Sequence, residues 1–224
     1  WTGDFEFAPS LYRFTADVSG GVRVSLGGVP KLNKWAQTGT NVWSFDSVAD
    51  GLQRVMVEFT APSSSARIKL GWHRVARTLA GKVVFGDRTV SVPNGATLEF
   101  RRPGQTTAFE SKTVPLSADG SFSLADAPSA IVDVSVKQGT WLRRTVRLDL
   151  SSGNVTGGTI ALVNGDVDGD NSVTVFDYGI LSDAFDSSEG SPQWDARADL
   201  DGDGSVTVFD YGILSDNFDK TGDE

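Results

Sequence analysis

A duplicated, aspartate-rich segment constrains the fold of this chain more than any other feature of its sequence. The residues DVDGDNSVTVFDYGILSDAFDS at 166–187 recur as DLDGDGSVTVFDYGILSDNFDK at 199–220, and the two copies differ at four of 22 positions. Each copy passes from a run of aspartates to a pattern typical of a short helix, which we expect at 176–185 and 209–218. Similarity of this length at a fixed spacing indicates duplication of one structural unit.

The aspartates within each copy have the spacing of an EF-hand loop. Such a loop supplies oxygen ligands to Ca²⁺ from positions 1, 3, 5, 7, 9 and 12. The sequence therefore predicts two calcium ions, held by carboxylates at four positions, a backbone carbonyl at position 7, and a hydroxyl or water at position 9. The predicted ligands of the first loop are Asp166, Asp168, Asp170, Ser172, Thr174 and Asp177. Those of the second loop are Asp199, Asp201, Asp203, Ser205, Thr207 and Asp210.

The other loop positions agree with this interpretation. Position 6 needs a positive φ, and it is Gly204 in one loop and Asn171 in the other, two residue types that adopt this conformation. Position 8 is Val173 or Val206, and an apolar residue there predicts that the two loops pair back to back. Because four carboxylates in one loop repel each other strongly, we expect the module to fold together with its calcium.

The charge of the chain is concentrated in the same region. Residues 165–224 contain sixteen Asp and Glu but only Arg197 and Lys220 as cations, a local charge of 2 − 16 = −14. The rest of the chain therefore carries −9 + 14 = +5. An acidic block of this kind attracts cations and repels nucleic acid, so we expect no nucleic-acid partner. The absence of cysteine excludes disulfides and thiolate metal sites. No apolar run approaches the roughly 20 residues of a membrane span.

Short segments rich in β-branched and aromatic residues fill the remainder of the chain, separated by turn residues. They predict a mainly β protein with two antiparallel β-sandwich modules, at 1–76 and 77–163, followed by a small α-helical calcium module at 164–224. The expected elements include a hairpin turn at Gly20-Gly21 and a strand at 88–92. Only Asn164 and Gly165 separate the last strand from the first aspartate, which predicts rigid attachment of the calcium module.

Residues 165–224 resemble a type I dockerin domain, because each loop has Asp at position 12 and a helix after it. The resemblance implies a calcium-dependent docking module, a cohesin domain as its partner, and an extracellular location. It also implies that positions 10 and 11 take part in partner choice, often as a hydroxyl pair. Here these positions are apolar, and we predict as partner-binding residues Val175, Phe176, Val208 and Phe209. The aromatic residues Phe176, Tyr178, Phe209 and Tyr211 could form such an interface. The alternative is that they pack the two repeats together or attach the module to its β neighbour.

The β modules give weaker resemblances. Residues 1–73, with WTGDFEFAPSLYRFTADV and VMVEFT, resemble the protective-antigen-type β-sandwich domain, and 78–163 are similar to carboxypeptidase-regulatory or prealbumin-like sandwiches. Protective-antigen-type domains carry further strands before this point, so we expect the first sandwich to be truncated at its N-terminal side. Some of them bind sugars through calcium and adjacent aspartates, but no Asp-Asp pair occurs in this chain.

The sequence does not favour an enzyme. His73 is the only histidine, and no nucleophile elbow, phosphate loop or metalloprotease motif is present. The leading hypothesis is a noncatalytic, extracellular structural protein that self-associates into a filament or surface assembly. A first alternative is a docking subunit for a separate cohesin-like partner. A second is a carbohydrate-binding module that uses the first sandwich.

Overall fold

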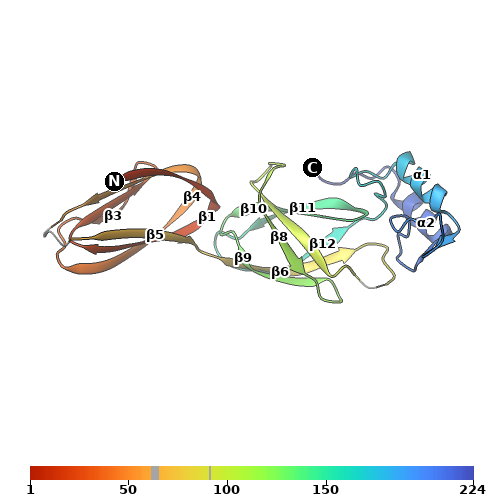
Figure 1. Ribbon diagram of the computed structural model, residues 1–224, viewed down its shortest axis with the longest axis horizontal. Helices are drawn as coiled ribbons and strands as arrows, with labels where there is room; N and C mark the ends of the chain where they lie inside the picture. The colour runs from red at the N-terminus through yellow and green to blue at the C-terminus, as the bar shows by residue number, and fades with distance from the viewer. Residues whose placement is uncertain (62–65, 91) are drawn as a thin grey trace. The chain divides into compact units, whose positions relative to one another are not determined.

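The chain folds into two compact units that are formed mainly by β-strands. The computed structural model describes residues 1–61, 66–90 and 92–224 (Figure 1). The first unit contains Trp1–Arg77 together with the segments Asp126–Ile131 and Asp149–Asn154. The second contains Thr78–Ala125, Val132–Leu148 and Val155–Glu224. None of the helices within the described ranges has the length and apolar character that crossing a membrane requires.

The first unit is built on five antiparallel strands in the order β3-β2-β4-β1-β5. Their bounds are Thr2–Ser19 for β1, Val22–Leu26 for β2, Val29–Lys34 for β3, Thr40–Phe59 for β4 and Ile68–Arg74 for β5. The two long strands pair from Thr2 and Met56 to Ser19 and Thr40, with a register shift between Phe7 and Ser10.

This long ribbon of β1 and β4 bends back on itself. The amide of Gly20 bonds to the carbonyl of Gly39, next to the start of β4, whereas the amide of Thr60 bonds to the carbonyl of Gly21, beyond its end. The two ends of β4 therefore lie close together, and the halves of the ribbon face each other as the layers of a sandwich. The hairpin turn predicted at Gly20-Gly21 is wrong, because β1 and β2 each pair with β4 and not with each other.

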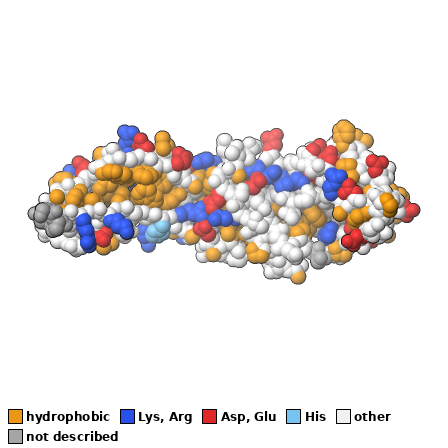
Figure 2. All heavy atoms as spheres, in the orientation of Figure 1, with side chains coloured by type: hydrophobic (Ala, Val, Ile, Leu, Met, Phe, Trp, Pro, Cys, Tyr) orange, Lys and Arg blue, Asp and Glu red, His pale blue; other side chains and the backbone are white. Residues whose placement is uncertain are grey.

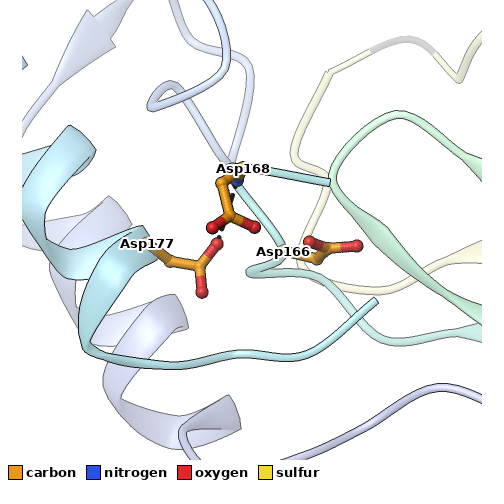
Figure 3. Close-up of side chains that lie close together, drawn as sticks. All are labelled: Asp166, Asp168 and Asp177. Carbon is orange, nitrogen blue, oxygen red and sulfur yellow. Dashed lines mark hydrogen bonds between the residues drawn. The ribbon is translucent and has the colours of Figure 1, made fainter. Parts of the chain in front are cut away.

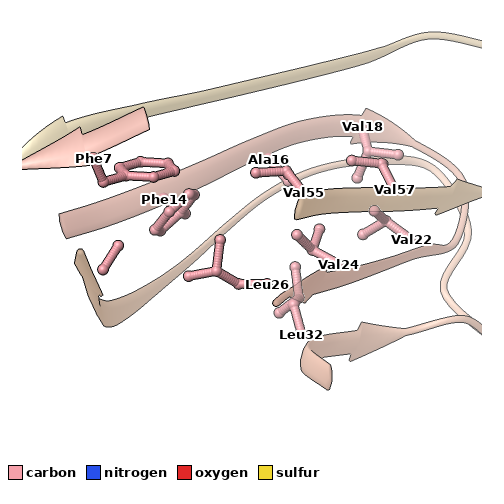
Figure 4. Close-up of a cluster of buried hydrophobic side chains, with 11 residues drawn as sticks. Phe7, Phe14, Ala16, Val18, Val22, Val24, Leu26, Leu32, Val55 and Val57 are labelled. Carbon is pink, nitrogen blue, oxygen red and sulfur yellow. The ribbon is translucent and has the colours of Figure 1, made fainter. Parts of the chain in front are cut away.

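Apolar side chains from both halves of the ribbon fill the space between them (Figure 4). Phe14 and Val18 of β1 are fully buried, as is Val55 of β4. Trp72 of β5 is partly buried and packs against Phe14, with 5.7 Å between the ring centroids. The alternation of inward and outward residues along β1 and β4 follows from the period of two in a β-strand, since adjacent side chains point to opposite faces.

The second unit contains two further sheets. One has the order β11-β10-β7-β8 and the other has the order β12-β6-β9. The bounds are Arg77–Phe85 for β6, Gly95–Arg101 for β7, Ala108–Pro115 for β8, Ser121–Ala127 for β9, Ile131–Gln138 for β10, Trp141–Asp149 for β11 and Val155–Leu162 for β12. Their core includes Leu98, Phe100 and Val134, all fully buried.

Two details of these sheets differ from the sequence predictions. Strand β12 pairs with β6 in parallel, so the second module is not purely antiparallel. A strand was expected at 88–92, but residues 88–90 are irregular, 92 is not in a strand, and 91 lies outside the described residues. The physical reason is a competing partner: the amide of Thr89 bonds to the carbonyl of Asp201 at 3.0 Å instead of to a neighbouring strand.

The second unit also contains the duplicated segment. It forms the helices α1, Val175–Ala184, and α2, Val208–Asn217, with the short strands β13, Ser187–Ser188, and β14, Ser205–Val206. Leu181, Val206 and Leu214 form its core, and Leu142 of β11 belongs to the same cluster. A mainly β protein followed by a two-helix module is confirmed. The module boundaries at 76/77 and 163/164 stay predictions, and the second unit includes residues on both sides of position 163.

Candidate metal centres and docking face

The first aspartate-rich loop brings three carboxylates to one place. Oxygen atoms of Asp166, Asp168 and Asp177 all lie within 4.8 Å of one another (Figure 3). Asp166 and Asp177 are fully buried, whereas Asp168 is exposed. Asp166 and Asp168 come from the loop, and Asp177 comes from the first turn of α1. Clustered carboxylate oxygens are the ligands that Ca²⁺ prefers, so these residues fit a calcium ion.

The second loop forms an equivalent group with a different membership. Oxygen atoms of Asp199, Asp201 and Asp203 lie within 4.8 Å of one another. Each group thus contains three of the four aspartates that the sequence predicted as ligands. The fourth predicted aspartate lies outside the group in each loop: it is Asp170 in the first loop and Asp210 in the second.

Backbone hydrogen bonds hold the first aspartate of each loop in the same way. Asp166 accepts from the amides of Gly169 and Asn171, at 2.9 and 3.0 Å. Asp199 accepts from Gly202 and Gly204, at 2.8 and 3.1 Å. The amides lie three and five residues after the carboxylate in both loops, so the same spacing in the sequence gives the same pair of hydrogen bonds.

The position-12 aspartate links each loop to its helix. Asp177 accepts from the amide of Asp168 through one oxygen and from the amide of Thr174 through the other. Thr174 in turn caps α1, because its hydroxyl accepts from the amide of Phe176 at 3.2 Å. Asp210 and Thr207 form the same capping box on α2. The position-9 hydroxyls thus each accept a hydrogen bond from their own helix, and their role towards an ion stays a prediction.

Burial makes these carboxylates costly without a cation. Burial raises the pKa of Asp166, although a hydrogen bond from Lys137 and two backbone amides oppose this shift. Burial also raises the pKa of Asp199, and the neighbouring Asp210 and Asp201 raise it further. A bound divalent cation would favour the ionised form of both groups.

The turns at position 6 confirm the prediction of positive φ. Asn171 has φ 74° and Gly204 has φ 91°. The amides of Ser172 and Ser205, at position 7, bond to the position-5 aspartates at 2.8 and 2.9 Å. Their carbonyl oxygens are the ligands predicted there.

The two loops do not pair back to back, so that prediction is wrong. Val173 in the first loop exchanges backbone hydrogen bonds with Asp219 and Lys220, which follow α2. Val206 in the second loop pairs with Ser187, which follows α1. Each loop is therefore closed by the segment that follows the other helix. The valines are buried, as expected, but they pack against the core that the two helices share.

The four predicted partner-binding residues lie at the surface. They occupy the first turns of α1 and α2, where Phe176 is 70% exposed and Phe209 is 68% exposed. Val175 and Val208 are exposed to a similar extent. The alternative that the repeats pack together through these side chains is therefore wrong for these four residues, but it is correct for Tyr178 and Tyr211. Hydrophobic side chains stand out over α1 in Figure 2.

The contact between the helices is made by other aromatic residues. Tyr178 and Tyr211 meet edge to face, with ring centroids 4.7 Å apart. Burial, followed by the interaction with Tyr211, raises the pKa of Tyr178 to about 12. The edge-to-face contact of these two rings packs α1 against α2.

The sequence did not reveal which β-sheet residues hold the loops. Asn164 is fully buried, and its side chain accepts from the Thr140 hydroxyl at 2.8 Å and donates to the carbonyl of Leu200 at 2.7 Å. The carbonyl of Thr140 accepts from the amides of Gly165 and Asp166. No motif marks Thr140, because its role depends on where the turn between β10 and β11 lies in space.

Two features of the first unit bear on the other functions that the sequence raised. His73 is exposed on β5, and among the described residues no ion pair involves it. A groove in the first unit is lined by Trp1, Phe5, Val57, Ile68, Leu70 and Trp72. All of these side chains are hydrophobic, whereas recognition of a sugar also needs well-placed polar groups.

Comparisons with known proteins give the same assignment for the helical region. Residues 164–218 match the family model of the dockerin type I domain, a noncatalytic, calcium-binding module. No curated protein sequence matches the chain. Two similar solved structures are a C-terminal and an N-terminal interface mutant of a type II cohesin–X-dockerin complex from Acetivibrio cellulolyticus. Each is 19% identical in sequence to this chain, with a TM-score of 0.52. Each match covers 65% of this chain and 97% of the matched chain in the solved structure. This likeness concerns the fold.

Proposed function

We propose, from the premise that residues 164–218 are a dockerin type I domain, that the chain is a calcium-dependent docking subunit that binds a cohesin-like domain of another protein. One observation carries the proposal: the domain presents Val175, Phe176, Val208 and Phe209 to solvent on the first turns of its two helices. Because calcium is abundant outside cells, we place this interaction there.

The calcium ions have a structural role in this proposal. In the first loop, Asp166, Asp168 and Asp177 would hold the ion, with Asp170 and the carbonyl of Ser172 completing the set. In the second, the equivalent residues are Asp199, Asp201, Asp203, the Ser205 carbonyl and Asp210. A bound ion supplies positive charge among carboxylates that otherwise repel each other. It thereby fixes the position-12 aspartate in the first turn of each helix, and with it the exposed apolar pair.

The exposed Val-Phe pairs are suited to a partner with apolar pockets. Large hydrophobic side chains that are exposed in the free protein contribute most to binding where they enter such pockets. Hydroxyl groups at these positions would need hydrogen-bonding partners. We therefore expect the cohesin-like domain to present apolar side chains opposite Phe176 and Phe209.

Calorimetric titration with a panel of type I and type II cohesin domains tests this function. We expect at least one domain to bind in calcium and to lose binding in a chelator. The double variant F176A/F209A should reduce the affinity at least about 100-fold, as expected for two central aromatic residues. A matched control is V48A/L52A, which shortens two exposed apolar residues of β4 in the first unit and should leave binding unchanged.

The same variants separate docking from self-association. Failure of every cohesin domain to bind, or full binding by F176A/F209A, would contradict the proposal. The self-association hypothesis instead predicts particles that grow with protein concentration in calcium, as measured by analytical ultracentrifugation. The family match favours docking to a separate partner over a filament.

A further inference from the structure

One lysine of the β-sheets forms an ion pair with the first aspartate of the first calcium loop, whereas the equivalent aspartate of the second loop forms none within the described ranges. Lys137 lies near the end of β10, and its ammonium is 2.7 Å from Oδ2 of Asp166. The same ammonium donates to the carbonyl of Gly139 at 2.8 Å. The Lys137 side chain is 20% exposed and that of Asp166 is fully buried. This ion pair is therefore shielded from water, where charge interactions are stronger than at an open surface.

The turn between β10 and β11, which follows Lys137, holds the backbone of Asp166, the ion-pair partner of this lysine. The carbonyl of Thr140 accepts from the amide of Asp166 at 2.9 Å and from that of Gly165 at 3.1 Å. The first residue of the loop is thus bound to the β10–β11 turn through its backbone and to β10 through its side chain. Lys137 acts on the loop through Asp166 and is a positioning residue.

The second loop has the same internal hydrogen bonds but a different electrostatic environment. Among the described residues, no ion pair involves Asp199, the equivalent of Asp166. Arg88 lies over the backbone of Gly202, yet no ion pair in the described ranges joins it to an aspartate of that loop. Arg197 adds to the asymmetry, since it interacts electrostatically with Asp168 of the first loop.

This asymmetry has opposite consequences for the two states of the first loop. Without calcium, Lys137 neutralises a buried carboxylate and so stabilises the empty loop. With calcium, the fixed ammonium repels the divalent cation, because both are positive and only partly screened. Both effects lower the calcium affinity of the first loop. At the second loop the Arg88 guanidinium beside Gly202 also repels the ion, but no ion pair in the described ranges neutralises Asp199, so the stabilisation of the empty loop is missing there.

We infer that Lys137 sets the order of calcium binding: the second loop fills first, and the first loop fills only at a higher calcium concentration. The inference rests on the proposed function of both loops as calcium sites. It makes two loops of nearly identical sequence unequal through a residue outside the repeat.

A calcium titration followed by NMR on the ¹⁵N-labelled full chain resolves the two loops. The amides of Gly169 and Asn171 report on the first loop, and those of Gly202 and Gly204 report on the second. We expect the second loop to reach half-saturation at roughly tenfold lower free calcium, the effect of one close, partly buried charge. In K137M the affinity of the first loop should rise roughly tenfold, so that the two curves coincide.

Two further variants test whether the charge of Lys137 is responsible. K137R keeps the charge and should preserve the separation of the curves. K82M removes a lysine of the same unit that is 44% exposed and 3.9 Å from Asp119, and should move neither curve. K137Q, which keeps a polar side chain, replaces K137M if circular dichroism shows that K137M does not fold in calcium.

The possible failures of the inference and of the function are distinct. An unchanged or weakened first loop in K137M, or an equal shift of both loops, would overturn the role of Lys137. So would wild-type loops that fill together. If none of the four amides responds to calcium in the wild-type chain, the proposed calcium sites themselves are wrong.

Discussion

The two copies of the duplicated segment differ at four of 22 positions, yet they lie in different surroundings. Asn171 in the first copy accepts from the amide of Arg143 at 2.7 Å and donates to the carbonyl of Asp223 at 3.1 Å. Gly204, its counterpart, has open space where a side chain would lie. The asparagine therefore connects the first loop to β11 and to the end of the chain through its side chain. The second loop has no side chain at this position, and Thr89 and Asn164 hold it instead through the carbonyls of Asp201 and Leu200.

The other differences lie where the copies meet neighbouring structure. Asn217 of the second copy donates to Asp87 at 3.1 Å, and Lys220 donates to Asn217 at 2.6 Å. Their counterparts, Ala184 and Ser187, are buried. By contrast, the predicted ligands and the exposed Val-Phe pairs are identical in the two copies. The comparison shows that the copies differ where they pack and agree where we propose that they bind.

Removal of calcium by a chelator should have the largest effect on the stability of the two copies. Both helices should lose stability by several kcal/mol, because each carries a ligand aspartate in its first turn. The second copy should lose more hydrogen-exchange protection than the first, since Lys137 and Asn171 still hold the first loop. Hydrogen exchange with mass spectrometry measures both. Equal protection of the two copies in the chelator would show that the β-sheet contacts do not stabilise the first loop.

Truncation of the equivalent leucines to alanine should lower the unfolding free energy of both copies by similar amounts. Leu181 and Leu214 are both buried in the core between the helices. Replacing either by alanine should cost about 2–5 kcal/mol of unfolding free energy, the usual range for a buried leucine. Urea unfolding in saturating calcium gives the values. If the unfolding free energy lost by one of the two variants lay within this range and that of the other did not, the two halves of the core would not be equivalent.

Single variants of the exposed phenylalanines sharpen the comparison at the docking face. F176A and F209A should each change the unfolding free energy by less than about 0.5 kcal/mol, because both side chains are exposed. At least one of them should weaken cohesin binding by about 2 kcal/mol or more in calorimetry. If one alone does so, a single copy makes the main contact with the partner.

Exchanging the position-6 residues tests their different connections. N171G should lose about 1–2 kcal/mol, since it removes two partly buried hydrogen bonds while glycine tolerates the positive φ. G204N should cost less than about 1 kcal/mol, because its side chain meets open space. Thermal unfolding in calcium compares them. The opposite order would mean that backbone conformation outweighs the contacts of Asn171.

The smallest expected effect is a pH dependence in the spacer between the copies. Hydrogen bonds from Arg197 lower the pKa of Asp195, so the ionised aspartate is more stable in the folded chain than in the unfolded one. This contribution is present above the unfolded pKa of Asp195 and is lost as the pH falls through the lowered folded value. Because the pair is partly exposed, we expect only a few tenths of a kcal/mol. D195N should remove this part of the pH profile in acid unfolding experiments.

The sequence alone predicted the local features of the duplicated segment. The helices begin one residue before their expected starts, and position 6 has the expected positive φ in both loops. These features were predictable because ligands, turns and caps lie within a few residues of one another. Asn171, for example, lies five residues after Asp166, whose carboxylate accepts from its amide, so this turn follows from the spacing within the loop.

Only the tertiary structure decided which residues far apart in the sequence meet. It closed each loop with the segment after the other helix, paired β12 in parallel with β6, and left Phe176 and Phe209 at the surface. It also placed Lys137 beside Asp166, although nothing around Lys137 in the sequence marks it as part of a site. Contacts of this kind depend on how separate elements pack, and a pattern of residue types along one strand carries no information about its distant neighbour.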